Sequence, residues 1–315
     1  MAGREAGSLW AYRPRLLDAG PLLYRSVMSD VLVVRDLVER LTGWLRRLMP
    51  PGARRDALIA VLTERFQAVD APVTAADCVA IERCAWTVSR HLALTFEPGG
   101  TGRPDTVSPG WPDPDPDVVR ARAACVSQVR RLADGTCLIG VDDLDAISLA
   151  QPYLDAAFAL AQGSARILLD LRANGGGDPA TVAHIAGRLL GDTPTQLSEV
   201  VYPDRRRQWW TPALPSGTSL RQPVAILVGP GTFSSGEALA YHLQARSRVT
   251  VVGETTPGAA DHITPIRLAP TVLAHLPEAY VVDSTTGTNW EGTGVVPDVV
   301  SPPETAIETA VAALR

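Results

Sequence analysis

The stretch PVAILVGPGTFSSGEALAYHL, residues 223–243, combines an apolar run, a glycine-rich turn and a helical pattern. The β-branched residues of Pro223–Gly229 favour a buried strand, and the apolar spacing after Ser235 favours a helix. Ser234 and Glu237 have the spacing of a capping box, in which two side chains satisfy free N–H groups at a helix start. The stretch therefore predicts a strand–turn–helix unit. Its Ser234 is either a helix cap or a nucleophile at the positive end of the helix dipole.

A second glycine-rich turn occurs in ILLDLRANGGGDPA, residues 167–180, where another apolar strand pattern precedes a helical one. Glycines allow a backbone to approach a ligand closely. An N–H group of Gly175 or Gly176 is therefore a candidate oxyanion donor, and an ordinary strand-to-helix turn is the alternative. A phosphate-binding loop is disfavoured because the GxxxxGK[ST] pattern is missing.

The rest of the chain predicts an α/β protein preceded by a helical domain. Residues 1–75 show helical periodicity, and residues 76–120 predict a helix, a strand and a connector rich in Pro, Gly and Asp. Residues 121–315 alternate strand and helix patterns, which is typical of an α/β core. We expect domain boundaries near residues 75 and 120.

The composition argues against several classes of partner. The net charge is -5 and 20% of residues are charged, so the balance favours neither nucleic acid nor an anionic membrane surface. No apolar run reaches the roughly 20 residues of a membrane span, and the first residues show no secretory pattern, so we expect a cytoplasmic protein. The 4 cysteines are spread without metal-ligand spacing, so we expect no metal and no cofactor.

All 29 basic residues are arginine, because the sequence contains no lysine. A lysine therefore cannot act as a general base or form a Schiff base. The 5 histidines are the main candidates for a base that works near neutral pH.

Four motifs, in order, resemble those of the S41 peptidases. They are DLRANGGG (170–177), GTFSSGEALA (231–240), VVGETTPGAA (251–260) and NWEGTGVVPDVV (289–300). The family includes C-terminal processing proteases, the tricorn core protease and the modules of interphotoreceptor retinoid-binding protein. The segment VSRHLALTFEP, residues 88–98, is similar to an Asp-x-His-Leu segment of the retinoid-binding-protein branch. The resemblance implies a ClpP/crotonase-like core and a serine hydrolase that acts on peptide or other acyl substrates.

The resemblance also implies roles for individual residues. The serine three positions before the glutamate of S-x-x-E is the family's nucleophile, which is Ser234 here. The N–H of Ser235, together with that of Gly175 or Gly176, would form the oxyanion hole. The processing proteases use a lysine as base, and Ala259 stands at that position.

A tricorn-like arrangement then remains, in which a histidine activates the serine. The matching residues are His91 as the base and Glu291 as a carboxylate that fixes the tautomer or polarises the site. Ser89 is a candidate for the second serine of that arrangement. Asp261 and His262 follow the loop that lacks the lysine, and His262 is the reserve base.

Substrate recognition is expected from the insertion between core helix and core strand, residues 192–223. Its Arg207, Trp209 and Trp210 could hold a peptide carboxylate and an apolar side chain, or form a solvated strand with an aromatic cover. The same chemistry would also suit an acyl transferase or a cyclase, and a site without catalysis would suit a protein that binds apolar ligands. An oligomer is possible.

Overall fold

The computed structural model describes residues 32–103, 106–107, 111 and 113–315. The expectations for the first 31 residues, which include the absence of a secretory pattern and the start of the helical domain, lie outside the described residues. Residues Leu32–Arg315 form one compact unit. The predicted domain boundaries near residues 75 and 120 stay predictions.

The central sheet has the strand order β12-β9-β8-β5-β4-β3. Neighbouring strands are parallel from β12 to β4, and β3 is antiparallel to β4. Its strands are β3 (Val126–Arg131), β4 (Thr136–Val141), β5 (Arg166–Asp170), β8 (Val224–Val228), β9 (Thr250–Gly253) and β12 (Val299–Val300).

Helices cover both faces of this sheet. Helices α5 (Ile147–Ala161), α6 (Pro179–Leu190) and α7 (Ser235–Ala245) share one buried cluster with alternate residues of the strands. Helix α8 (Ala306–Ala313) packs on the residues of the opposite face. The apolar runs of β4, β5 and β8 are therefore buried on both faces, as expected of parallel strands. The predicted α/β fold class is confirmed.

The second sheet is antiparallel, with the order β2-β10-β11-β6-β7, and β1 also pairs with β11. Its strands are β1 (Ala93–Phe96), β2 (Thr106–Val107), β6 (Gln196–Val201), β7 (Arg206–Trp210), β10 (His262–Ala269) and β11 (Val272–Asp283). The insertion at residues 192–223 thus supplies the hairpin of β6 and β7.

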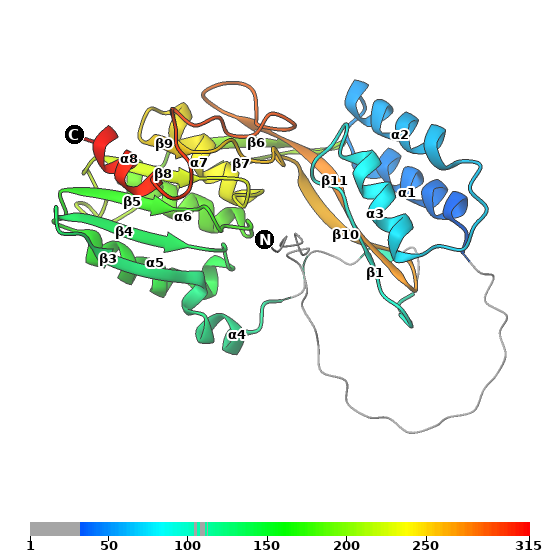
Figure 1. The fold of residues 1–315 in the computed structure, drawn as a ribbon, viewed down its shortest axis with the longest axis horizontal. Helices are drawn as coiled ribbons and strands as arrows, with labels where there is room; N and C mark the ends of the chain where they lie inside the picture. The colour runs from blue at the N-terminus through cyan, green and yellow to red at the C-terminus, as the bar shows by residue number, and fades with distance from the viewer. Residues whose placement is uncertain (1–31, 104–105, 108–110, 112) are drawn as a thin grey trace, which may run out of the picture. The chain divides into compact units, whose positions relative to one another are not determined.

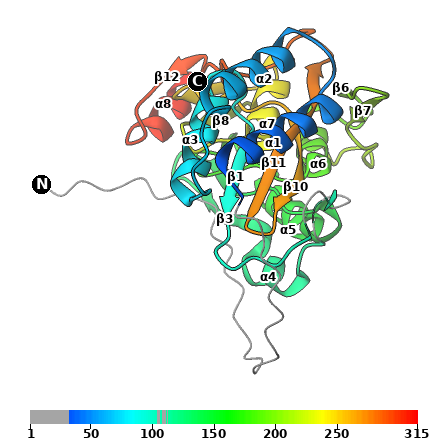
Figure 2. The same cartoon turned by 90° about the vertical axis from the view of Figure 1, so that its right-hand side faces the viewer.

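The N-terminal helices share a core with strands from the far end of the sequence. They are α1 (Val34–Leu48), α2 (Ala53–Phe66) and α3 (Ala75–Ala85), which begins with a capping box of Thr74 and Asp77. Their buried faces share a core with β1, β10 and β11, and Figures 1 and 2 show α1 beside β11. Between β2 and β3 the chain forms a short helix, α4 (Pro116–Ala121), at the predicted end of the connector, and a 3-10 turn at Ala123–Cys125.

This topology places two loops at one edge of the central sheet. Strands β5 and β8 are parallel neighbours, so the loops that follow them leave at the same end. The loop after β5 carries the three glycines, and the loop after β8 carries Ser234 at the start of α7. The fold therefore brings together the two turns that the sequence analysis singled out.

Candidate active site

Ser234 has an unusual backbone conformation. It precedes the first residue of α7 with φ 52° and ψ -118°, in the left-handed region that a serine seldom adopts. Such a conformation costs about 1–3 kcal/mol and is concentrated at functional sites. The nucleophilic serine of α/β-hydrolases also lies on a strained strand-to-helix turn. Glu237 accepts the Ser234 N–H at 2.9 Å, which supplies the carboxylate half of the predicted capping box.

The turn is held against the glycine loop by close backbone contacts. The Phe233 N–H donates to the Asn174 carbonyl at 2.8 Å. A Cβ placed on Gly236 would lie 2.5 Å from Asn174 Oδ1, and one on Gly176 would lie 2.9 Å from Ser234 Cβ. Glycine is required at both positions because no side chain fits between the loops.

The N–H groups that are candidate oxyanion donors differ in whether they already donate a hydrogen bond within the protein. The Gly175 N–H donates to the Asp142 carbonyl at 3.2 Å, and the Gly176 N–H donates to Asn174 Oδ1 at 3.0 Å. Within the described part of the chain, the N–H groups of Ser235 and Gly177 have no acceptor. Ser235 Oγ donates to the Gly177 carbonyl at 2.8 Å, so these two residues are adjacent. The roles predicted for Gly175 and Gly176 would require their present bonds to open, and they stay predictions.

His91 is buried beside the turn that carries Ser234. Its ring meets the Phe233 ring edge-on, with 5.3 Å between centroids. Its Nδ1 lies 2.5 Å from the Asp261 carbonyl, which can only accept, so Nδ1 carries the proton and Nε2 keeps a lone pair. Burial lowers the pKa of His91 to about 4. The imidazole is therefore neutral at pH 7 and in the tautomer that a general base requires.

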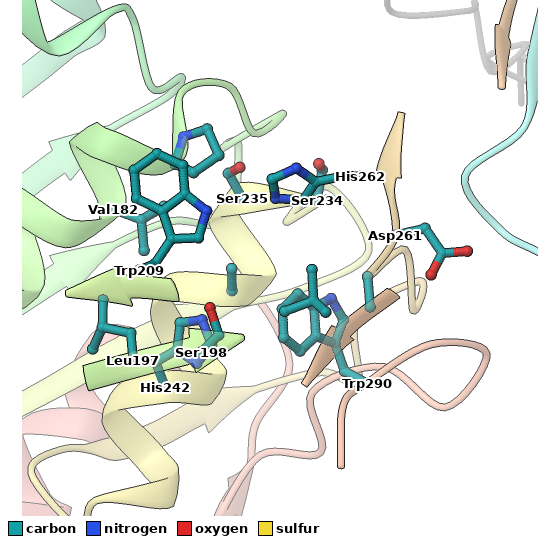
Figure 3. Close-up of a pocket in the computed structure, with 14 residues that line it drawn as sticks. Val182, Leu197, Ser198, Trp209, Ser234, Ser235, His242, Asp261, His262 and Trp290 are labelled. Carbon is teal, nitrogen blue, oxygen red and sulfur yellow. The ribbon is translucent and has the colours of Figure 1, made fainter. Parts of the chain in front are cut away.

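His262 lines the same cavity as Ser234 and Ser235, and Figure 3 shows it beside them. Its Nδ1 lies 3.4 Å from the Tyr202 hydroxyl. Burial, and to a smaller extent the charges of His91 and Arg207, lower the pKa of His262 to about 4. In the described part of the chain no hydrogen bond joins Ser234 Oγ to either histidine.

Glu291 holds the backbone near both histidines. Its Oε1 accepts from the Arg90 N–H at 2.8 Å, and its Oε2 accepts from the Ala260 N–H at 2.7 Å. These bonds fix the residue before His91 and the turn before His262. Glu291 has no hydrogen bond with a histidine ring in the described residues, and the Asp261 carbonyl fixes the tautomer of His91 instead.

Asp261 forms a buried ion pair that the sequence analysis missed. Its two carboxylate oxygens lie 2.5 and 2.6 Å from Arg54 Nη2, which comes from α2. Figure 3 shows the carboxylate turned away from the serines. Burial, followed by the charge of Glu291, raises the pKa of Asp261 to about 7 although Arg54 lowers it. The side chain of Asp261 therefore anchors the loop, whereas its carbonyl orients His91.

Glu237 is a second residue whose role went unrecognised. Its side chain is fully buried and also accepts from Thr256 Oγ1 at 2.5 Å, Gly258 N–H at 2.7 Å and Ala259 N–H at 2.9 Å. Burial raises the pKa of Glu237 to about 7. Glu237 thus joins the loop that contains Ala259 to the turn that carries Ser234. The S-x-x-E spacing could have revealed this link.

The remaining predicted site residues are placed as follows. Ser89 is fully buried, and its Oγ has no hydrogen-bond partner among the described residues. Trp209 lines the cavity, and the Arg207 guanidinium covers its ring at 4.1 Å from the centroid. Trp210 is exposed, donates to Gln208 Oε1 at 3.1 Å and does not line the cavity.

The described residues contain neither a candidate membrane span nor a candidate metal site. No helix there is long and apolar enough to cross a membrane. No group of three or more His, Cys, Asp and Glu side chains there could hold a metal ion.

Comparisons with known proteins extend the sequence resemblance. A proposed peptidase from Parabacteroides merdae matches with a TM-score of 0.63 and 16% identity, over 90% of this chain and 97% of that one. A lipoprotein from Streptococcus agalactiae matches with a TM-score of 0.56 and 14% identity, over 93% of this chain and 99% of that one. Both share the fold. The model of peptidase family S41 matches residues 140–301, which include Ser234 and both glycine turns, and the chain therefore belongs to peptidase family S41.

Proposed function

We propose that the protein is a serine peptidase in which Ser234 is the nucleophile and a neutral histidine is the base. The observation that carries this proposal is the backbone of Ser234, held at φ 52° where α7 begins and where a cavity opens. Two neutral imidazoles lie near this position. Membership of family S41 supports peptides as the substrates.

The reaction follows from the groups present. Ser234 Oγ attacks the peptide carbonyl carbon while its proton passes to the histidine. The carbonyl oxygen becomes negative and is stabilised by the Ser235 N–H at the start of α7, with the Gly177 N–H nearby. The intermediate then expels the amine, which takes the proton from the imidazolium. A water molecule repeats the sequence on the ester, which releases the acid and restores Ser234.

We assign the base to His91, with His262 as the alternative. His91 has its Nδ1 proton held by a backbone carbonyl, so its Nε2 is free to accept. His262 lies in the cavity with the serine, but its Nδ1 faces the Tyr202 hydroxyl. The absence of lysine from the sequence removes the serine–lysine mechanism used by the processing proteases.

Labelling by a fluorophosphonate probe tests this proposal, because the probe reacts with activated serines. We expect labelling of the wild type, none in Ser234→Ala and near-normal labelling in Ser235→Ala, whose backbone N–H is retained. His91→Ala should slow labelling at least about a hundredfold, within the range of general-base contributions, and His262→Ala should slow it less. No labelling of a folded wild type would contradict the proposal. The opposite order for the two histidines would move the base to His262.

A further inference from the structure

The cavity beside Ser234 has polar groups on the side away from the nucleophile. It measures about 40 Å³, and Figure 3 shows His262 and the two serines on one side and Ser198 and His242 on the other. Along α7, the residues Ser235, Ala238 and His242 line one wall, as their spacing of three and four requires. The cavity therefore extends from the nucleophile along two turns of the helix.

His242 lines this cavity, and one of its two ring nitrogens is bound to a carboxylate. Its Nδ1 lies 2.7 Å from Asp283 Oδ2, and the fully buried Asp283 also accepts from Arg246 Nη1 at 2.8 Å. Burial lowers the pKa of His242, although the bond to Asp283 opposes this. The ring is therefore neutral, with its proton on Nδ1. Its Nε2 lone pair has no partner among the described residues.

Trp209 presents a donor. Its Nε1 is buried and has no hydrogen-bond partner in the described part of the chain. The Arg207 guanidinium stacks on the ring, and Figure 3 shows the nitrogen edge of the ring turned toward the other lining side chains. A buried N–H without an acceptor is unfavourable, so this position is suited to an acceptor on a bound ligand.

The chemistry of these groups selects one kind of side chain. An acceptor is needed for Trp209 Nε1–H and a donor for His242 Nε2, while the Ser198 hydroxyl can act as either. A carboxamide carries both on one carbon atom, as a carbonyl oxygen that accepts and an NH₂ group that donates. A carboxylate carries only acceptors, and no arginine lines the cavity in the described residues to balance its charge.

We infer that this cavity is the subsite for the residue whose carbonyl carbon Ser234 attacks, and that it selects a carboxamide side chain, glutamine or asparagine. The inference rests on the proposed function. His242 and Trp209 are then specificity-determining residues.

Binding to the Ser234→Ala protein tests the inference without catalysis. Calorimetry would compare acetyl-Ala-Ala-Gln-Ala-Ala-amide with its methionine counterpart, and the asparagine peptide with its leucine counterpart. We expect the carboxamide member of at least one pair to bind ten times more tightly or better, because the apolar member leaves buried polar groups unpaired. Preference for the apolar member in both pairs, or equal or undetectable binding, would overturn the inference.

Variants of the cavity identify the groups responsible. Trp209→Phe removes the N–H but keeps a ring, and His242→Asn keeps an N–H for Asp283 but removes Nε2. Each should reduce the preference at least about threefold, whereas the exposed Trp210→Phe should leave it unchanged. An unaltered preference in both cavity variants would contradict the assignment. Fluorophosphonate labelling of the wild type reports on the nucleophile independently, so failure of the proposed function is distinguishable.

Discussion

Replacement of Arg54 by methionine should destabilise the protein increasingly as the pH rises. Arg54 Nη2 contacts both carboxylate oxygens of Asp261, and its Nη1 lies 3.7 Å from Glu291 Oε1. The two acidic side chains are 0% and 5% exposed. Removal of one partner from a buried ion pair typically costs about 3–5 kcal/mol, because the remaining charge is buried without compensation.

Protonation of Asp261 limits this loss, and the sign of its pH dependence follows. The pKa of Asp261 in the folded protein is raised from 3.8 to about 7. Between these values the folded state binds more protons than the unfolded state, so this group lowers stability as pH rises. Without Arg54 the pKa rises further, and the loss of stability continues above pH 7. We expect a deficit of about 1–2 kcal/mol at pH 6 and about 3 kcal/mol at pH 8.5.

Urea unfolding followed by tryptophan fluorescence measures both values. Arg55→Met is the matched control, because Arg55 pairs with the exposed Asp56 at 3.1 Å and should change stability by less than about 1 kcal/mol. The double variant Arg54→Met/Asp261→Asn should recover most of the loss at pH 8.5. A deficit below about 0.5 kcal/mol at pH 8.5, or one that shrinks as pH rises, would refute the reasoning.

Three further predictions concern Ser234 and the residues around it. Gly176→Ala should slow fluorophosphonate labelling at least about tenfold, because the new Cβ would lie 2.9 Å from Ser234 Cβ. Gly217→Ala is the control: Gly217 also has a positive φ, of 78°, but its new Cβ would meet no neighbour. This variant should lose only about 1 kcal/mol of stability and keep its labelling rate. Glu237→Gln should lower the free energy of unfolding by about 2 kcal/mol in urea, since one carboxylate oxygen becomes an amide NH₂ group that cannot accept; an unchanged midpoint would contradict this. The labelling rate should stay level from about pH 8 to pH 5 and fall only near pH 4, because the pKa of His91 is lowered to about 4; an acid limb near 6.5 would show a solvated base.

The sequence predicted those parts of the site that depend on local patterns. The strand–turn–helix unit around Ser234 follows from an apolar run, glycines and helical spacing within about 20 residues. The neighbouring glycine turn follows in the same way. The selection of His91, Glu291 and His262 came from the family resemblance, because no local pattern distinguishes them from other polar residues.

Other contacts depend on the packing of distant segments. Arg54 and Asp261 are 207 positions apart, and nothing in the helix pattern of α2 separates Arg54 from its neighbour Arg55. The pairing of His242 with Asp283 requires α7 to pack beside the end of β11, which sequence periodicity does not specify. Whether each glycine N–H finds an acceptor depends on its backbone angles, such as φ 105° at Gly176 and φ 127° at Gly177. Three identical residues in a row do not specify these different angles.

Peptide cleavage in ¹⁸O-labelled water tests the central claim most directly. Mass spectrometry of a peptide mixture should show one ¹⁸O atom in each new C-terminus with the wild type, because water releases the acyl group from Ser234. Ser234→Ala should give no cleavage. Acyl products joined to another amine and free of ¹⁸O would indicate a transferase or a cyclase. Cleavage that persists in Ser234→Ala, or none by a wild type that still reacts with fluorophosphonate, would contradict a peptidase that uses this serine.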